Sequence, residues 1–400
     1  MAIARPKRLA APVTKTVGVA EGESAGDMND NLSDMNEQAK SVPTAMQRLI
    51  QAQLAKQGGW MPFDRFMALA LYAPGLGYYS ARQQQIGRMP QDGSDFVTAP
   101  EISPYFGQAL ANSLREALQH THTHEVFEFG AGKGSLAKQL LDALGDVVQR
   151  YTIIDVSGSL RARQSQTLQA HAHKLNWLNE WPDELRGVVV GNEVLDAMPV
   201  RLLQRLSGVW HERGVVWHDD QQGFAWQDRI TDERPPCSIE GDHDYLCEIH
   251  TQAEAFVRSV GERLQQGAVF LIDYGFPEHE YYHPQRHMGT LMCHQAHQSD
   301  GNPLIHVGEK DITAHINFTG VALAAQEVDL HILGYSSQAH FLLNSGLLSL
   351  LENASVPERS MAQKLIQDHE MGELFKVMVI GRGEPWTPMG FVQADRTHRL

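Results

Sequence analysis

The stretch E-V-F-E-F-G-A-G-K-G-S-L, residues 125–136, decides the fold of this chain. It starts as a run of strand-forming residues and passes through Gly130, Gly132 and Gly134 into a segment with leucines at helical spacing. Glycine has no Cβ atom, so the backbone can turn tightly and approach a ligand closely. Free N–H groups at the start of the following helix favour a carboxylate or a phosphate. We therefore predict a strand–turn–helix unit that binds a nucleotide-type cofactor; a plain structural turn is the alternative.

The spacing of these glycines distinguishes between NAD and S-adenosylmethionine as the cofactor. The pattern is G-x-G-x-G, with Glu128 two residues before the first glycine. The dinucleotide fingerprint G-x-G-x-x-G fails because Ser135 follows Gly134. S-adenosylmethionine has an amino-acid end, and a carboxylate at the tip of the strand can hold its ammonium group. The pattern therefore favours S-adenosylmethionine over NAD.

Around this stretch, short apolar runs alternate with helical segments. Such unbroken runs suit strands that helices bury on both faces. The alternation predicts a parallel, doubly wound sheet and hence a Rossmann-like α/β fold. We expect F-K-V-M-V-I-G-R, residues 375–382, as a last strand, antiparallel and on an edge. The other predicted strands are Y-T-I-I-D-V (151–156), G-V-V-V-G-N-E (187–193) and A-V-F-L-I-D-Y-G (268–275).

The region before this core divides into a tail and a helical cap. Residues 1–43 have few large apolar side chains, so we expect a disordered tail. Its first sixteen residues are basic without an acid, which fits either such a tail or a transit peptide. Apolar spacing predicts helices over 44–57 and 62–72, and a third helix starts after Ser103, a good N-cap residue. We assign residues 44–120 to this N-terminal helical cap.

Residues 121–400 form the predicted core, with two insertions. The first, at about 201–260, begins as a small β-meander over 201–227. The second, over 276–310, is rich in His, Tyr, Gly and Pro and is expected to form a long loop over the site.

Composition excludes some partners and compartments. The chain has 400 residues, and 33 basic against 48 acidic residues give a net charge of −15, which disfavours nucleic acid as a partner. Cys237, Cys247 and Cys293 show no zinc-site or disulfide spacing and fit a reducing compartment. No apolar run is long enough to span a bilayer. We expect a soluble protein of the cytoplasm, or of the mitochondrial matrix if the organism is eukaryotic, without membrane insertion.

Polar residues follow the predicted strands at the edge where ligands bind in such sheets. Asp155 ends the second strand and can accept both ribose hydroxyls of a cofactor; a helix N-cap is the alternative. Asn192 and Glu193 end the next strand, and a carboxylate there can clamp a guanidinium. The alternative is that both satisfy local backbone groups. Asp196 is either a site or a turn residue, and Asp273 is either a wall of the site or a structural residue that closes a turn.

The histidine-rich segment does not predict a metal site. His283 and His287 are four residues apart, but Pro284 argues against a helix that presents them together. No H-E-x-x-H pattern occurs in the sequence. We predict no metal and interpret the segment as a polar lid.

Several segments together resemble the MidA-like family, which includes the mitochondrial complex I assembly methyltransferase. The resemblance runs from about residue 45 to 385, and T-A-P-E-I-S-P and D-I-T-A-H are its most specific parts. The matching segments are L-Y-A-P-G-L-G-Y-Y-S (71–80), F-V-T-A-P-E-I-S-P-Y-F-G-Q (96–108), E-F-G-A-G-K-G (128–134), G-N-E-V-L-D-A-M-P-V (191–200), F-L-I-D-Y-G (270–275) and G-E-K-D-I-T-A-H-I-N-F-T (308–319).

The resemblance implies a class I methyltransferase fold, S-adenosylmethionine as cofactor and, in eukaryotes, methylation of an arginine on a complex I subunit. It implies that the three glycines cradle the cofactor and that Thr98 and Glu101 lie on a lid near its methionine end. Asn192 and Glu193 would face the methyl group, and His315 would border the substrate channel. The protein substrate is thus expected to be a complex I subunit, and the oligomeric state stays open.

This sequence departs from the family in three places. Asp155 stands where the family usually has Glu, and Asn317 where Asp is common. The segment M-C-H-Q-A-H-Q, residues 292–298, replaces a more basic stretch, so the lid that faces the substrate is expected to differ. Two rival functions remain: an NAD-dependent oxidoreductase, and an assembly factor that binds the cofactor without essential catalysis.

Overall fold

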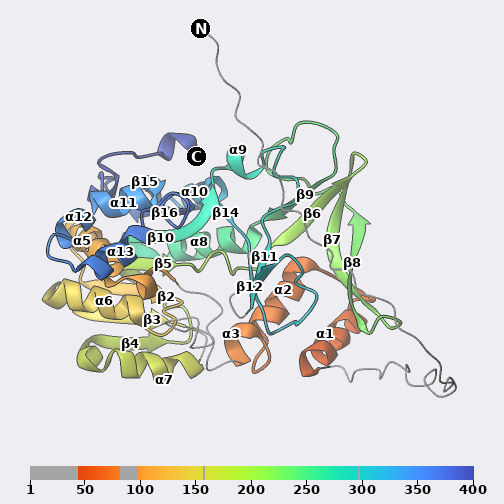
Figure 1. The fold of residues 1–400 in the computed structure, drawn as a ribbon, viewed down its shortest axis with the longest axis horizontal. Coiled ribbons are helices and arrows are strands. Elements are labelled where there is room, and N and C mark those ends of the chain that lie inside the picture. Colours follow the sequence, from red (N-terminus) through yellow and green to blue (C-terminus); the bar gives the residue numbers. More distant parts are fainter. Residues whose placement is uncertain (1–43, 82–97, 156–157, 296–297) are drawn as a thin grey trace, which may run out of the picture. The chain divides into compact units, whose positions relative to one another are not determined.

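The centre of the fold is an eight-stranded β-sheet, which the computed structural model shows in the order β15-β16-β10-β5-β2-β3-β4, with β14 paired to β10 (Figure 1). Neighbouring strands from β10 to β4 run parallel. The structure describes residues 44–81, 98–155, 158–295 and 298–400, and the predicted tail over 1–43 lies outside them. The strands are β2 (Glu125–Phe129), β3 (Arg150–Ile154), β4 (Leu175–Leu178), β5 (Leu185–Asn192), β10 (Leu264–Phe276), β14 (Ile316–Asn317), β15 (His331–Ser337) and β16 (Phe375–Arg382).

Helices bury both faces of this sheet. Successive side chains of a strand point to opposite faces. Val188 and Val190 of β5 therefore pack into one core, with residues of α5 and α6, whereas Val189 packs into a second core, with residues of α8 and α10. The predicted Rossmann-like α/β fold is confirmed. These helices are α5 (Pro104–His120), α6 (Ser135–Leu144), α8 (Thr251–Arg263) and α10 (Phe318–Gln326).

The prediction for the last strand was right in direction and wrong in position. β16 is antiparallel, but it pairs with β10 on one side and with β15 on the other, so it is not an edge strand. The edge strand on this side of the sheet is β15, H-I-L-G-Y-S-S, in which Gly334 and the serines Ser336 and Ser337 break the apolar pattern. Pairing with β16 and packing of Tyr335 stabilise it as a strand, and both depend on tertiary contacts.

The predicted N-terminal helices form at the expected positions. Thr44 and Gln47 make a capping box at the start of α1 (Ala45–Lys56), and α2 covers Phe63–Tyr72. Ser103 caps α5 by accepting a hydrogen bond from the backbone N–H of Tyr105. The other helices are α3 (Tyr78–Ala81), α4 (Ala99–Ile102), α7 (Gly158–Thr167), α9 (Glu278–Tyr281), α11 (Gln338–Asn344), α12 (Leu347–Leu350) and α13 (Val356–Lys364), with 3-10 turns at Gly145–Val147, Gln169–Lys174, Met389–Phe391 and Thr397–Arg399.

The predicted meander is part of a second, antiparallel sheet. Its order is β1-β7-β6-β9, with β8 paired to β7. Met61, Phe63 and Phe66 share a core with Leu202 and Val215, so α2 and this sheet are packed together. The strands are β1 (Trp60–Pro62), β6 (Arg201–Leu206), β7 (Val209–His218), β8 (Gly223–Ile230) and β9 (Tyr245–Ile249).

The segment 276–310, predicted as a long loop, contains regular structure. It includes α9 and two strands, β11 (Met292–Gln295) and β12 (Gln298–Asp300), which form a three-stranded sheet with β13 (Asp311–Thr313). Cys293 is fully buried in the core that α2 also joins, and this burial stabilises a strand that composition did not predict. None of the described helices is both long and apolar enough to cross a membrane.

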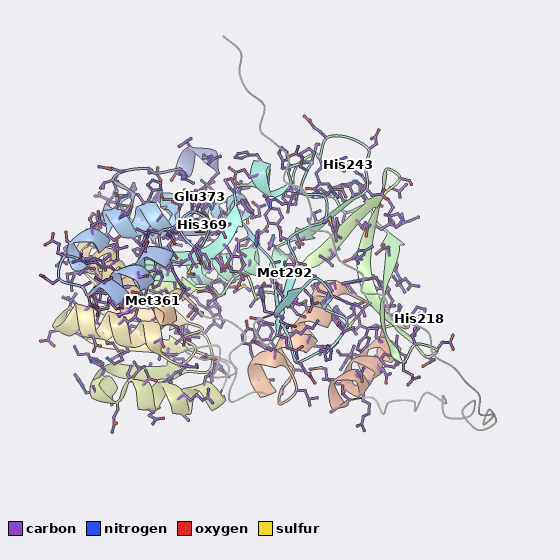
Figure 2. All side chains as sticks on the ribbon, in the orientation of Figure 1. His218, His243, Met292, Met361, His369 and Glu373 are labelled. Atoms are coloured by element: carbon purple, nitrogen blue, oxygen red, sulfur yellow. The ribbon has the colours of Figure 1, made fainter. Side chains whose placement is uncertain are left out.

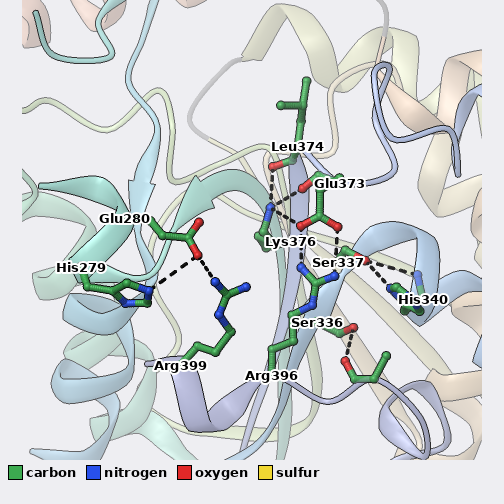
Figure 3. Close-up of polar contacts among 11 residues, drawn as sticks. His279, Glu280, Ser336, Ser337, His340, Glu373, Leu374, Lys376, Arg396 and Arg399 are labelled. Atoms are coloured by element: carbon green, nitrogen blue, oxygen red, sulfur yellow. Dashed lines mark hydrogen bonds and ion pairs between the residues drawn. The ribbon is translucent and has the colours of Figure 1, made fainter. Parts of the chain in front are cut away.

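Ion pairs connect the last residues of the chain to the central sheet (Figure 3). Arg396 contacts Glu373, and its Nη2 atom lies 3.0 Å from the carboxylate oxygen Oε2. Arg399 pairs with Glu280 of α9. Lys376, at the start of β16, lies 3.8 Å from the same Glu373. Residues 396–399 are thereby fixed beside the edge at which β10 ends and β16 begins.

Candidate active site

A cavity of about 380 Å³ lies at the carboxyl ends of β2, β3 and β5. This is the edge at which an open α/β sheet binds ligands. Its lining combines the glycine loop after β2 with acidic and aromatic side chains from segments far apart in the sequence. The acidic members are Glu101, Glu128, Asp155, Glu193, Asp196 and Asp311, and the aromatic members are Tyr72, Tyr78, Tyr79, Phe129, Trp181, Phe256 and Tyr274.

The glycine loop has the backbone that its sequence predicted. Gly130, Gly132 and Gly134 have positive φ angles of 63°, 52° and 86°, a region that side-chain-bearing residues seldom adopt. A Cβ atom on Gly130 would lie 2.9 Å from Cγ1 of Val194. Gly130 and Gly132 line the cavity, whereas Gly134 is the N-cap residue of α6 and is not part of the lining.

Two predicted cofactor acids lie beside this loop. Glu128 is 2% exposed and accepts a 2.7 Å hydrogen bond from the Tyr151 hydroxyl. Burial raises the pKa of Glu128 to about 7, against the lowering effect of the Tyr151 bond. Asp155 follows β3, and the Gln164 side-chain amide donates to its Oδ2 and to the Gly132 carbonyl, both at 3.0 Å. Gln164 therefore connects the second strand's acid directly to the glycine loop.

Three aromatic rings form an apolar wall of the same cavity. Phe129 lies 4.8 Å from Trp181 and 5.0 Å from Phe256, measured between ring centroids. Flat apolar walls of this kind suit a purine ring. With the glycine loop and the two acids, the cavity fits a nucleoside that carries a charged amino-acid end.

Asn192 and Glu193 lie next to each other in the lining, at the end of β5. The Asn192 amide donates to Glu193 Oε1 at 2.9 Å. Among the described residues, neither Glu193 Oε2 nor Asn192 Oδ1 has a hydrogen-bond partner, although both atoms are buried. Burial, together with repulsion from Asp196, raises the pKa of Glu193 to about 8. In the ionised form of Glu193, its Oε2 atom and Asn192 Oδ1 are therefore two acceptor oxygens available to hydrogen-bond donors of a ligand.

Thr98 and Glu101 also line the cavity, at the start of the short helix α4. Glu101 Oε1 lies 3.9 Å from the Nζ atom of Lys133, which belongs to the glycine loop. This ion pair connects α4 to the loop between β2 and α6.

Asp273 is not part of the lining, so its interpretation as a wall of the site was wrong. Its Oδ2 atom accepts hydrogen bonds from the backbone N–H groups of Leu195 and Asp196, at 3.0 and 3.3 Å. The structural alternative is confirmed: Asp273 holds the turn that follows β5.

His315 lies behind Tyr274 rather than in the lining. The two rings are 5.2 Å apart, and the His315 backbone N–H donates to the Thr290 hydroxyl. Burial lowers the pKa of His315 to about 4, which leaves the ring neutral near pH 7.

The sequence pattern did not single out the part of the lining that contains Tyr72, Tyr79 and Tyr274. Tyr72 and Tyr79 stack with their ring centroids 5.5 Å apart. The Tyr79 hydroxyl donates to Asp311 Oδ1 at 2.8 Å, and the Tyr274 hydroxyl donates to Asp196 Oδ2. These residues lie in the quoted family segments, but their proximity depends on the tertiary fold.

The histidines are widely distributed. His218 at the end of β7, His243 before β9 and His369 after α13 lie in separate parts of the fold (Figure 2). Of the histidines in the 276–310 segment, His294 lines the cavity, and His283 and His287 do not. In the described part of the chain, no three His, Cys, Asp or Glu side chains are grouped to hold a metal ion.

Comparison with known proteins assigns the enzyme class. Residues 107–336 match a family model described as "Putative S-adenosyl-L-methionine-dependent methyltransferase". The match covers more than half of the chain. The chain belongs to this family. It is an S-adenosylmethionine-dependent methyltransferase, so the predicted enzyme class and cofactor are confirmed and the oxidoreductase alternative is wrong.

Solved structures and curated relatives agree with this assignment. A protein from Burkholderia thailandensis, solved with bound S-adenosyl-homocysteine, is 44% identical, with a TM-score of 0.85 over 90% of this chain and 100% of that one. "Protein arginine methyltransferase NDUFAF7 homolog, mitochondrial" from Drosophila melanogaster is 26% identical over 88% of each chain. The human "Protein arginine methyltransferase NDUFAF7, mitochondrial" is 26% identical over 85% of this chain and 82% of its own. The resemblance drawn from the motifs is confirmed.

Proposed function

We propose that this methyltransferase modifies the guanidinium group of an arginine in a protein, and that the protein is a subunit of respiratory complex I. One observation carries the choice of arginine: Glu193 Oε2 and Asn192 Oδ1 are buried acceptors without a partner among the described residues, side by side in the cavity. A guanidinium has N–H donors in a planar fork that matches carboxylate geometry. The names of the relatives support the same acceptor.

The cofactor is proposed to bind along the glycine loop. Gly130 and Gly132 would admit its chain close to the backbone, and Glu128 would pair with its ammonium group. Asp155 would accept the ribose hydroxyls, and the aromatic wall would hold the adenine. Gly134 contributes indirectly, because it shapes the start of α6.

At the methionine end, Thr98 and Glu101 are proposed to cover the cofactor from α4. Asn192 is proposed to contact both the cofactor and the acceptor, since it ends β5 and lines the same cavity as Glu128 and Glu193. His315 is proposed to border the substrate channel through Tyr274, whose ring it supports.

The chemistry demands alignment more than acid–base catalysis. When bound, S-adenosylmethionine supplies a methyl group that its positive sulfur already activates. The protein has to hold the acceptor nitrogen in line, and such positioning contributes about 7–11 kcal/mol to rate enhancement. Glu193 is proposed to orient the guanidinium and to stabilise the charge that develops on it.

The test compares methylarginine in complex I subunits from a strain that lacks this gene with the same strain complemented by wild type or by Glu193→Gln. Mass spectrometry should show a methylarginine that disappears on deletion, returns with wild type and stays absent with Glu193→Gln. An unchanged methylarginine profile in the deletion strain would exclude the proposed substrate.

A second assay separates catalysis from a role as a cofactor-binding assembly factor. Purified protein is given tritium-labelled S-adenosylmethionine and an extract of the deletion strain, with Gly132→Val as the matched negative control. Transfer of label to protein by wild type alone supports catalysis. If Glu193→Gln restores complex I in cells as well as wild type does while the methylarginine stays absent, the assembly-factor alternative is correct. The compartment is proposed to be that of complex I assembly: the cytoplasm of a bacterium, or the matrix for mitochondrial relatives.

A further inference from the structure

Asp196 lies three residues after Glu193, and its side chain enters the same cavity. It is 4% exposed. Its backbone is fixed on both sides, because its N–H donates to Asp273 and its carbonyl accepts a 3.0 Å hydrogen bond from Ala314. The backbone N–H groups of Ala197 and of Asp196 itself also donate to this carboxylate, so the side chain stabilises the turn and lines the cavity at the same time.

Tyr274 holds the Asp196 carboxylate in one orientation. The Tyr274 hydroxyl donates to Asp196 Oδ2. The Tyr274 ring packs edge-on against His315 at 5.2 Å and against Phe375 at 5.1 Å, so the tyrosine itself has little freedom. This arrangement fixes the direction of one carboxylate oxygen before any ligand binds.

The charge balance of the cavity favours a cation near Glu193 and Asp196. Lys133 is the only lysine or arginine in the described lining, and it lies beside Glu101. Burial raises the pKa of Asp196, and the pKa of Glu193 is raised by burial and by Asp196. Two buried carboxylates that repel each other are stabilised by a positive ligand between them.

Resting on the proposed arginine methylation, we propose that Asp196 is the second carboxylate that binds the substrate guanidinium, together with Glu193, and that Tyr274 is its positioning residue. A guanidinium offers several edges of N–H donors in one plane. Carboxylates at two edges fix that plane, whereas a lysine ammonium has no planar fork to be fixed in this way. Asp196 therefore acts in selecting arginine over lysine.

The test uses a probe that does not require the natural protein substrate. It is an adenosyl amino acid analogue with a guanidinoethyl group in place of the transferred methyl group, and its reference is S-adenosylhomocysteine. The affinity gain is the ratio of the two dissociation constants, measured by calorimetry on the full chain. Wild type should show a gain of about 10-fold to 100-fold, as expected for hydrogen bonds between charged groups. An aminoethyl analogue should show a smaller gain.

Asp196→Asn should abolish most of this gain and leave the dissociation constant of S-adenosylhomocysteine within about 3-fold of wild type. Tyr274→Phe keeps the charge of Asp196 and removes the hydroxyl that donates to Asp196 and bonds to Thr313, so it should lose about 3-fold to 10-fold of the gain. The matched control, Asp220→Asn, removes an exposed aspartate of the β7–β8 turn and should keep the full gain. Unchanged S-adenosylhomocysteine binding also verifies that each variant is folded.

The outcomes separate the two proposals. If wild type shows no gain for the guanidine analogue, the cavity does not bind guanidinium and the proposed arginine substrate is wrong. If wild type shows the gain and Asp196→Asn retains it, the arginine substrate stands and the role of Asp196 is wrong. If Asp196→Asn fails to bind S-adenosylhomocysteine, the test of the proposal passes to Tyr274→Phe. A full affinity gain for the guanidine analogue in Tyr274→Phe would contradict the proposal that Tyr274 positions Asp196 for the guanidinium.

Discussion

The two parts of the cavity are built in different ways. The part around Gly130, Gly132 and Glu128 comes from one continuous stretch, the strand–turn–helix unit of β2 and α6. The part around Tyr79, Asp196 and Tyr274 is assembled from α3, the turn after β5 and the end of β10. The proposed cofactor part therefore depends on local sequence, whereas the proposed substrate part depends on tertiary packing. Substitutions in the two parts should separate cofactor affinity from substrate selection.

Gly130→Val should give the largest effect, on cofactor affinity. Valine is strained at a φ of 63°, and its Cβ atom would lie 2.9 Å from Val194 Cγ1. Calorimetry should show binding of S-adenosylhomocysteine weakened by more than about 100-fold. Gly208→Ala is the matched control, because Gly208 has a φ of 81° with no atoms near its Cβ position, away from the cavity. Equal loss of S-adenosylhomocysteine binding in both variants would show that backbone strain weakens binding, and not the loss of space for the cofactor at the glycine loop.

Glu193→Gln tests the part of the cavity that is proposed to bind the substrate. The variant keeps the shape of the side chain and removes its charge, so turnover should fall by about 100-fold. Affinity for S-adenosylhomocysteine, measured by calorimetry, should stay close to wild type. A parallel loss of cofactor affinity would mean that the two parts are not separable.

The pH dependence of substrate binding should identify Glu193 as the group whose ionisation controls that binding. Its pKa of about 8, raised by burial and by Asp196 and Asp311, means that the free protein holds this carboxyl protonated below that pH. A guanidinium binds the ionised form, so affinity should rise by up to about 10-fold per pH unit between roughly pH 6 and pH 8 and then level off. Titration of the guanidine analogue measures this slope. Glu193→Gln should flatten it, and a slope that survives in this variant assigns the titration to another group.

Tyr151→Phe should have the smallest effect. It removes the hydrogen bond to Glu128 and leaves that carboxylate buried, at a cost of about 1 kcal/mol in the free energy of unfolding. The pKa of Glu128 should rise further, so S-adenosylhomocysteine should bind about 3-fold more weakly at pH 7. Urea unfolding and calorimetry measure the two effects. No change in affinity would argue against a contact between Glu128 and the cofactor.

Local sequence patterns predicted the strands whose burial on both faces produces an unbroken apolar run. Val188 to Val190 form an unbroken apolar run because both faces of β5 are buried, and such a run is visible in the sequence. β15 was missed because Gly334 and two serines interrupt its pattern, while pairing with β16 stabilises it. β11 was missed because burial of Cys293, and not composition, makes that segment a strand.

The residues of the site also differ in whether the local sequence predicts their position. Gly130 and Gly132 were predictable, because a positive φ angle leaves a signature in the residue type itself. Asp273 was ambiguous, because an aspartate at the end of a strand can face a ligand or a backbone amide; only the hydrogen bonds to Leu195 and Asp196 decide. The stacking of Tyr72 on Tyr79 leaves no local signature, since it depends on the packing of α2 and α3.

The Gln164 side chain has a further consequence. It is fully buried, and its amide bonds to the Gly132 carbonyl, to Asp155 and to the Trp177 indole N–H, at 3.0 Å in each case. One glutamine thus joins the first three parallel strands on the side where the nucleoside fits. Because a ligand that binds only the folded protein also stabilises it, we expect that loosening this glutamine would lower both cofactor affinity and resistance to heat.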